Sequence, residues 1–81
     1  MIEDRGDWLQ IAIHSSSFRQ MYRLAGAIAE SAVATGGERR AARRVVGTLR
    51  KVIDAPIADA ATLAKARKRF GRLVEFLQLA A

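Results

Sequence analysis

Residues 38–54 read ERRAARRVVGTLRKVID, and the pattern of this stretch is the clearest indication of the fold. Its apolar residues recur at steps of three and four, so they share one face of a helix, and that stripe consists of Ala42, Val45, Val46, Leu49, Val52 and Ile53. The opposite arc carries the cations Arg39, Arg40, Arg43, Arg44, Arg50 and Lys51. The pattern predicts a helix that packs on a core with one face and presents positive charge with the other.

A second helix is expected just before this stretch. Ser17 and Gln20 have the spacing of a capping box, and an apolar stripe at helical steps follows them. The pair Gly36-Gly37 supplies residues that suit a left-handed helix end and a tight reversal. We therefore expect this helix to span about Ser17 to Thr35 and the next one to begin near Glu38.

A further helix is expected after the stretch. Ala55-Pro56 ends the helix over 38–54 near Ile53 or Asp54, because the residue before a proline is pushed out of helical geometry. Asp59, or alternatively Thr62, then caps a final helix that reaches toward Ala80. Its apolar seam is Leu63, Ala66, Phe70, Leu73, Leu77 and Ala80.

Two large apolar residues of the final helix, Phe76 and Leu79, fall off its seam. Apolar groups on the wrong face of a helix indicate a second contact surface. We expect Phe76 and Leu79 to contact a partner or a second copy of the chain. A homodimer is therefore expected, and it suits a chain of 81 residues with a small core.

The first segment is open to three interpretations. Residues 8–14 read WLQIAIH, whose alternation is typical of a strand, yet Asp7 could cap a short helix there, or the segment could continue the helix that follows it. A helix is favoured, because a single strand has no partner within this chain. The fold class expected is all-α, with a small bundle of three main helices after a short N-terminal helix or strand. Residues 1–81 contain no internal repeat or linker, so one domain is expected.

Composition argues against catalysis. The chain has no cysteine, which excludes disulfides, thiolate zinc sites and cysteine nucleophiles. His14 is the single histidine and has no acid or serine at a spacing that makes a relay, and the acids are scattered. We expect no catalytic residue, no metal site and no cofactor.

No apolar run approaches the roughly 20 residues of a membrane span, and no secretory signal pattern is present, so a cytoplasmic location is expected.

Charge is the strongest functional signal, and it lies in the second half. Residues 1–35 hold three bases and four acids, a net of −1, whereas residues 36–81 hold eleven bases and four acids, a net of +7. Four cations share an arc of the final helix: Lys65, Lys68, Arg69 and Arg72. Arginine forks bind phosphate oxygens in pairs, so these side chains and the six of residues 38–54 predict binding to nucleic-acid phosphates. Gly47, in the middle of the first arc, would permit close approach of a phosphate or of another backbone.

Other interpretations remain open. Ala32, Gly36 and Val45 occupy the positions of a helix-turn-helix, with a recognition helix starting at Glu38. If residues 8–14 form a strand, the order of elements resembles the ribbon-helix-helix repressors in outline.

A protein-binding inhibitor or adaptor that docks on an acidic or apolar partner surface fits the composition as well. The charged side chains could also simply solvate their helices. A membrane-surface role is disfavoured, because the apolar face of 38–54 has no Trp or Phe anchor.

Overall fold

A computed structural model describes residues 5–55 and 57–80, with only the backbone of residue 80. A short 3-10 turn, Arg5–Asp7, leads into α1 (Trp8–Ile13), which is followed by α2 (Phe18–Glu30), α3 (Gly36–Asp54) and α4 (Ala60–Ala80). The secondary structure of the described part of the chain is all-helical, which confirms the all-α part of the predicted fold class. Residues 8–13 form a helix, so the strand alternative and its resemblance to ribbon-helix-helix repressors are excluded.

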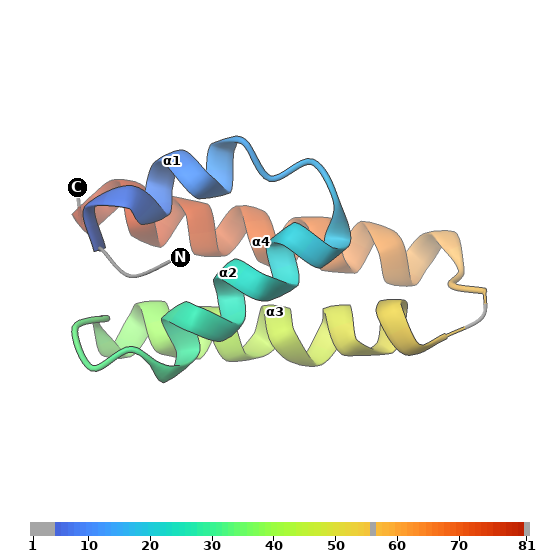
Figure 1. The fold of residues 1–81 in the computed structure, drawn as a ribbon. Coiled ribbons are helices and arrows are strands. Elements are labelled where there is room, and N and C mark those ends of the chain that lie inside the picture. The colour runs from blue at the N-terminus through green and yellow to red at the C-terminus, as the bar shows by residue number, and fades with distance from the viewer. Residues whose placement is uncertain (1–4, 56, 81) are drawn as a thin grey trace.

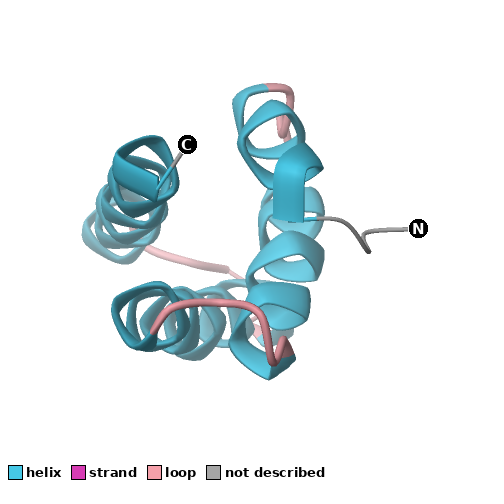
Figure 2. Ribbon diagram, turned by 90° about the vertical axis from the view of Figure 1, so that its left-hand side faces the viewer, coloured by secondary structure: helices cyan, strands magenta, loops and turns pink. Residues whose placement is uncertain are grey.

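Helices α2 and α4 both pack on α3, and α1 packs on α4 and α2. Helices α3 and α4 run antiparallel side by side, and α2 crosses α3 at an angle (Figure 1). The short α1 lies against the C-terminal end of α4 and also touches α2. Figure 2 shows α1 and α2 on one side of the molecule, with α3 and α4 neighbouring each other on the other side. One face of the α3–α4 pair is therefore left without a covering helix.

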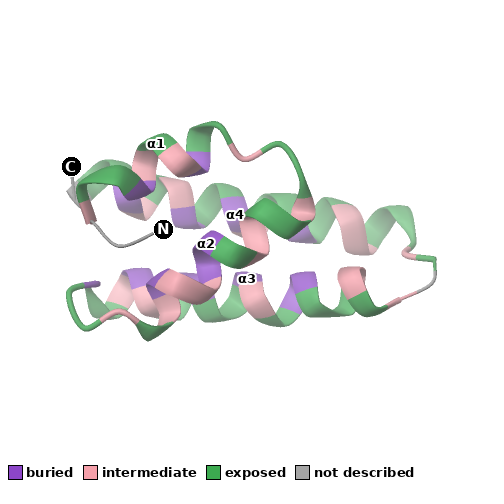
Figure 3. Ribbon diagram, viewed as in Figure 1, coloured by how far each residue is buried: buried purple, intermediate pink, exposed green. Residues whose placement is uncertain are grey.

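The core lies between the inward faces of the helices (Figure 3). The expected stripe of α3 is buried at Ala42, Val45 and Leu49, and Leu24 and Ile28 of α2 pack with it. Helix α4 contributes the buried part of its predicted seam, and Trp8 of α1 closes the end of the core. The buried α4 residues are Ala66, Phe70, Leu73 and Leu77. A buried aromatic side chain removes far more apolar area from water than an alanine does, so Trp8 and Phe70 offset the alanine content of this core.

The boundary between α2 and α3 differs from the sequence prediction. Helix α2 ends at Glu30, not near Thr35, and Gly36-Gly37 form the first turn of α3 instead of ending α2. No glycine among the described residues has a positive φ, so the expected left-handed reversal does not occur. The physical reason is a capping box at Thr35 and Glu38. The Glu38 N–H donates to Thr35 Oγ1 at 3.1 Å, and the Thr35 N–H donates to Glu38 Oε1 at 2.8 Å.

Most other helix ends follow the prediction. The exception is the start of α1, where Asp7 is the N-cap residue but its side chain makes no capping hydrogen bond. Ser17 and Gln20 form the predicted capping box at the start of α2. Helix α3 ends at Asp54, and the extended backbone of Ala55 has the geometry expected before a proline; Pro56 itself lies outside the described residues. The Thr62 N–H donates to Asp59 Oδ1 at 2.7 Å, so Asp59 and not Thr62 caps α4. Within the described residues, the helices lack the combination of length and apolar character that crossing a bilayer requires.

Candidate nucleic-acid interface

Cations from α3 and α4 line a single groove between the two helices. The groove encloses about 460 Å³, and none of its lining residues belongs to α1 or α2. We call it the basic groove, and its lining consists of Arg40 and Arg44 from α3, Lys65, Lys68, Arg69 and Arg72 from α4, and the uncharged residues Gly37, Ala41 and Phe76.

One cation of the basic groove, Arg69 of α4, is held in place by a hydrogen bond to α3. Arg69 Nη1 donates a hydrogen bond to Thr48 Oγ1 at 2.7 Å, and the Thr48 hydroxyl donates to the backbone carbonyl of Arg44 at 3.0 Å. Thr48 is only 4% exposed, so water does not compete strongly for its hydroxyl. Arg69 is itself half-buried. The α4 guanidinium is thereby held against α3 inside the groove.

The remaining cations of the groove are available to an anion. Arg40, Arg44, Lys65 and Lys68 are exposed, and their side chains make no hydrogen bond or ion pair within the described part of the chain. Arg72 Nε lies 3.8 Å from Glu75 Oε2, and both side chains are about 70% exposed. An exposed pair of this length contributes little, so it leaves Arg72 free to exchange partners. The groove therefore carries a concentration of positive charge that the fold does not neutralise.

The six cations predicted on 38–54 do not all line the same hollow. Arg39 and Arg43 lie toward the C-terminal end of α2, where they line a shallow hollow of about 720 Å³ with Glu30 and Ser31, and Arg40 lines this hollow as well as the basic groove. Arg39 Nη1 donates to the Ser31 carbonyl at 3.2 Å. The structure thus places Arg44 on the α4 side only, Arg39 and Arg43 on the α2 side only, and Arg40 between the two.

The last two cations of α3 lie outside both hollows. The neighbouring Tyr22 side chain of α2, and to a smaller extent the Asp54 carboxylate, raise the pKa of Arg50 above its usual value. Arg50 therefore lies near α2 and does not line the groove. Lys51 is exposed at the surface.

Phe76 and Leu79 separate in the structure. Phe76 is half-buried at one end of the basic groove, beside the first turn of α3. A Cβ built on Gly37 would come within 3.0 Å of Phe76 Cε1, so the ring lies directly against the backbone of Gly37. Leu79 is 84% exposed and does not line the groove. Only Phe76 therefore belongs to the same site as the cations.

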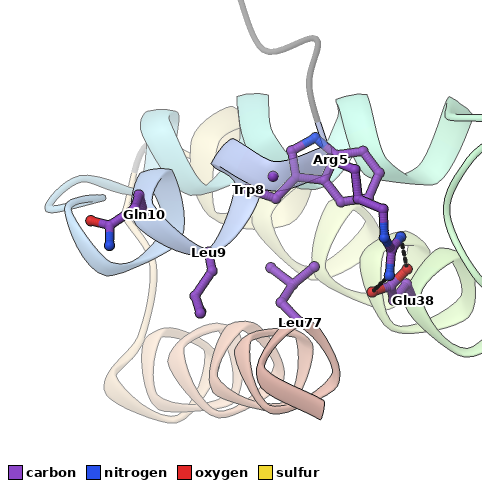
Figure 4. Close-up of a pocket in the computed structure, with 7 residues that line it drawn as sticks. Arg5, Trp8, Leu9, Gln10, Glu38 and Leu77 are labelled. Carbon is purple, nitrogen blue, oxygen red and sulfur yellow. Dashed lines mark hydrogen bonds and ion pairs between the residues drawn. The ribbon is translucent and has the colours of Figure 1, made fainter. Parts of the chain in front are cut away.

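A partly buried ion pair fixes the start of α3, and with it one end of the groove. Arg5 Nη1 donates to Glu38 Oε1 at 2.6 Å and Nη2 to Oε2 at 2.8 Å, a bidentate pair (Figure 4). The same guanidinium carbon lies 5.4 Å from the centroid of the Trp8 ring, and Arg5 also donates to the Val33 carbonyl. These contacts tie the N-terminal turn to the loop that precedes α3.

The ionisation of Glu38 follows from these contacts. Burial raises the pKa of Glu38, but the hydrogen bonds from Arg5 and Thr35 and the nearby Arg5 charge lower it by more, so its pKa lies below its usual value. Glu38 is 1% exposed. The helix-turn-helix layout would place it at the open start of a recognition helix, so this burial argues against that layout. Ala32 also lies in the loop between α2 and α3, outside either helix.

A third hollow lies beside this ion pair. It encloses about 350 Å³ and is lined by Arg5, Trp8, Leu9, Gln10 and Leu77, with Gly6 and Glu38 (Figure 4). The paired charges of Arg5 and Glu38 neutralise each other there. The residues that line this cavity include no unpaired cation like those of the basic groove, so the cavity attracts an anion much less strongly.

Two residues of the site were missed from the sequence. In the sequence, Thr48 is a single polar residue beside the apolar stripe of α3. It becomes a buried hydrogen-bond acceptor only because Arg69 of the neighbouring helix donates to it, and the sequence alone does not show that pairing. Gly37 reads as a helix end, although Thr35 and Glu38 already had the spacing of a capping box. That spacing would have placed Gly37 inside α3.

Comparisons with protein families, with curated proteins and with solved structures find no match to this chain. The site is therefore interpreted from its own geometry. His, Cys, Asp and Glu side chains do not gather in groups of three that could hold a metal ion anywhere in residues 5–55 and 57–80.

Proposed function

We propose that this protein binds nucleic acid, with the cations of the basic groove in contact with backbone phosphates. One observation carries the proposal: Arg40 and Arg44 of α3 line the same groove as four cations of α4. Within the described chain, the long contact of Arg72 with Glu75 is the only ion pair that an acid makes with these cations. Folding like charges into one groove costs electrostatic free energy unless an anion is bound. A polyanion offsets that cost.

The chemistry of the cations favours phosphate as the group that is bound. Four of the six are arginines, whose planar forks match two phosphate oxygens at once, and two are lysines, which act as point charges. Contacts of this kind supply affinity and little sequence choice. We therefore propose a non-enzymatic regulatory role in which the protein binds nucleic acid broadly and does not read one sequence.

Binding through phosphates makes a quantitative prediction about salt. Each phosphate that is neutralised releases condensed counterions, so a groove with about six cations gives a slope of log K against log salt near −4 to −5. The test is fluorescence anisotropy of labelled oligonucleotides with the pure protein across a salt series. A steep negative slope supports the proposal. Affinity that is absent at low salt, or that does not change with salt, contradicts it.

A protein-binding inhibitor or adaptor is the second candidate. The observation in its favour is exposed apolar surface, with Leu79 at 84% and Ile57 at 89% exposure. This candidate predicts a stoichiometric protein partner and no nucleic-acid affinity at physiological salt. The salt series above separates the two candidates.

The homodimer and the cytoplasmic location remain predictions. Leu79, near the end of α4, is the residue that supports a dimer contact. Sedimentation equilibrium of the wild type and of Leu79→Glu tests that contact, because a dimer that uses Leu79 dissociates when a charge is placed there.

A further inference from the structure

Phe76 adds an aromatic surface to the basic groove. It lies one turn beyond Arg72 on the same face of α4, and both residues line the groove. The ring is backed by Gly37 and remains partly exposed. Because Gly37 has no side chain, the first turn of α3 supports the ring without covering it. An aromatic ring beside phosphate-binding cations is the pairing on which the bases of a single strand stack.

The lining residues differ in how deeply they lie. Arg40, Arg44, Lys65, Lys68 and Arg72 are exposed, whereas Arg69 and Phe76 are half-buried. A ligand that remains at the surface reaches the first set only. A ligand that enters the groove also reaches the guanidinium that Thr48 holds and the Phe76 ring.

The width of the groove decides which nucleic acid can enter. The groove encloses about 460 Å³ between two packed helices, whose axes lie only about 8–10 Å apart. The major groove of B-DNA alone is about 12 Å wide, so a whole duplex cannot enter and reaches only the rim. A duplex is also stiff over tens of base pairs and cannot fold into the groove. A single strand is flexible and thin enough to follow it.

We propose that the basic groove takes a single strand of DNA or RNA, with phosphates on its cations and a base stacked on Phe76. This inference rests on the proposed function and narrows its ligand to one class. On α4 the lining residues run from Lys65 to Phe76, a rise of about 16 Å along the helix, so a short stretch of a strand spans the site.

The test compares matched ligands and matched variants. A labelled oligonucleotide of about ten residues is titrated as a single strand and as a duplex, in DNA and in RNA, with wild type, Phe76→Leu, Phe76→Trp and the control Ile13→Ala, an exposed apolar residue of α1 that does not line the groove. We expect the single strand to bind about tenfold tighter than its duplex. We expect Phe76→Leu to lose about tenfold for the single strand only, Phe76→Trp to retain or gain affinity, and Ile13→Ala to bind as the wild type does.

Each outcome separates this inference from the proposed function. Equal or tighter binding of the duplex, or undiminished single-strand binding by a folded Phe76→Leu variant, overturns the inference and leaves phosphate binding in place. A lack of affinity for every ligand overturns both. If Phe76→Leu fails to fold, Phe76→Trp decides alone: tryptophan fluorescence above the Trp8 background is quenched by the single strand if a base stacks there, and unchanged fluorescence contradicts stacking. Binding of either DNA or RNA strands supports the inference, and the ratio of their affinities shows which chemistry the groove prefers.

Discussion

Arg69 of α4 and Thr48 of α3 are joined by a 2.7 Å hydrogen bond from Nη1 to Oγ1, and this bond links a cation that lines the basic groove to a buried hydroxyl of the facing helix. Thr48 in turn donates to the carbonyl of Arg44 one turn earlier in α3. The bond therefore orients a cation of one helix through the backbone of the other. A guanidinium held in advance loses less conformational entropy when it binds a phosphate than a free one does.

The first prediction concerns this anchor. We expect Thr48→Val, which keeps the shape of the side chain and removes its hydroxyl, to weaken oligonucleotide binding by about threefold to tenfold, because Arg69 must then be ordered on binding. The free energy of unfolding is expected to change by about 1 kcal/mol or less, since the exposed part of the guanidinium recovers water as its partner. Anisotropy titration and urea denaturation measure the two effects.

A double-mutant cycle separates positioning from general damage. In an Arg69→Ala background, Thr48→Val is expected to have no further effect on affinity, because the group that it positions is absent. An undiminished loss in that background would show that Thr48 acts on binding by another route.

The second prediction tests how the structure divides the cations of α3. We expect Arg40→Glu with Arg44→Glu to reduce affinity at least about thirtyfold and to lower the salt slope by about 1.5 to 2, because two phosphate contacts become repulsive. The matched variant Arg39→Glu with Arg43→Glu makes the same change in net charge on the α2 side, and we expect less than about a tenfold loss, through long-range attraction alone.

A further control places the same charge change far from the groove. Arg19 and Arg23 are exposed on α2 and line none of the three hollows. Their reversal to glutamate should match the Arg39 and Arg43 variant. Equal losses in all three double variants would show that net charge, and not the basic groove, determines the affinity.

The third prediction concerns Gly47, which lies in the middle of α3. An added Cβ there meets no atom within 4 Å, so a methyl group fits without displacement. Alanine is favoured over glycine inside a helix by up to about 1 kcal/mol, so Gly47→Ala should raise the melting temperature by about 4–8 °C. Gly47 does not line the basic groove, and affinity should be unchanged. A loss of affinity would restore the interpretation that a phosphate approaches this glycine.

The fourth prediction concerns Glu38 and pH. The pKa of Glu38 is lower in the folded chain than its usual value of 4.5, so its charged form stabilises the fold above about pH 4.5, and this contribution is lost as the pH falls through the lowered folded pKa. We expect Glu38→Gln to be less stable at neutral pH by about 1–3 kcal/mol, because Arg5 loses its charged partner.

The difference between the two proteins should narrow as the pH falls below about 4.5, since the wild type then loses the same charge. Hydrogen bonds from Thr62 also lower the pKa of Asp59, but Asp59 is present in both proteins and cancels in the comparison. Urea denaturation from pH 7 to pH 3 measures the difference, and a gap that stays constant over this range would contradict the role given to Glu38.

The helices of this chain could be predicted because local signals determine them. The apolar stripe of α3 and the seam of α4 follow helical spacing, and Asp59 and Ser17 are capping residues of ordinary type. The start of α3 was misplaced because two glycines suggest a helix end when taken alone. The capping box of Thr35 and Glu38 decides the boundary, and the Arg5 pair reinforces it from 33 residues away.

The cationic residues of the site could be predicted, but their grouping could not. Helical angles place Arg39 and Arg43 on one side of α3 and Arg40 and Arg44 on the other, yet only packing shows that the second pair faces α4. The bond between Thr48 and Arg69 joins residues 21 apart in the chain. A contact of that kind depends on how two helices cross, which composition and periodicity leave open.

The most direct measurement of the central proposal is a two-dimensional NMR titration of the isotope-labelled protein with a single-stranded oligonucleotide at low salt. We expect the largest amide shifts at the first turn of α3, near Arg40 and Arg44, and along α4 from Lys65 to Phe76, with small shifts at Arg19 and Arg23 of α2. Shifts that centre on α2, or spectra that do not change at all, would contradict binding in the basic groove.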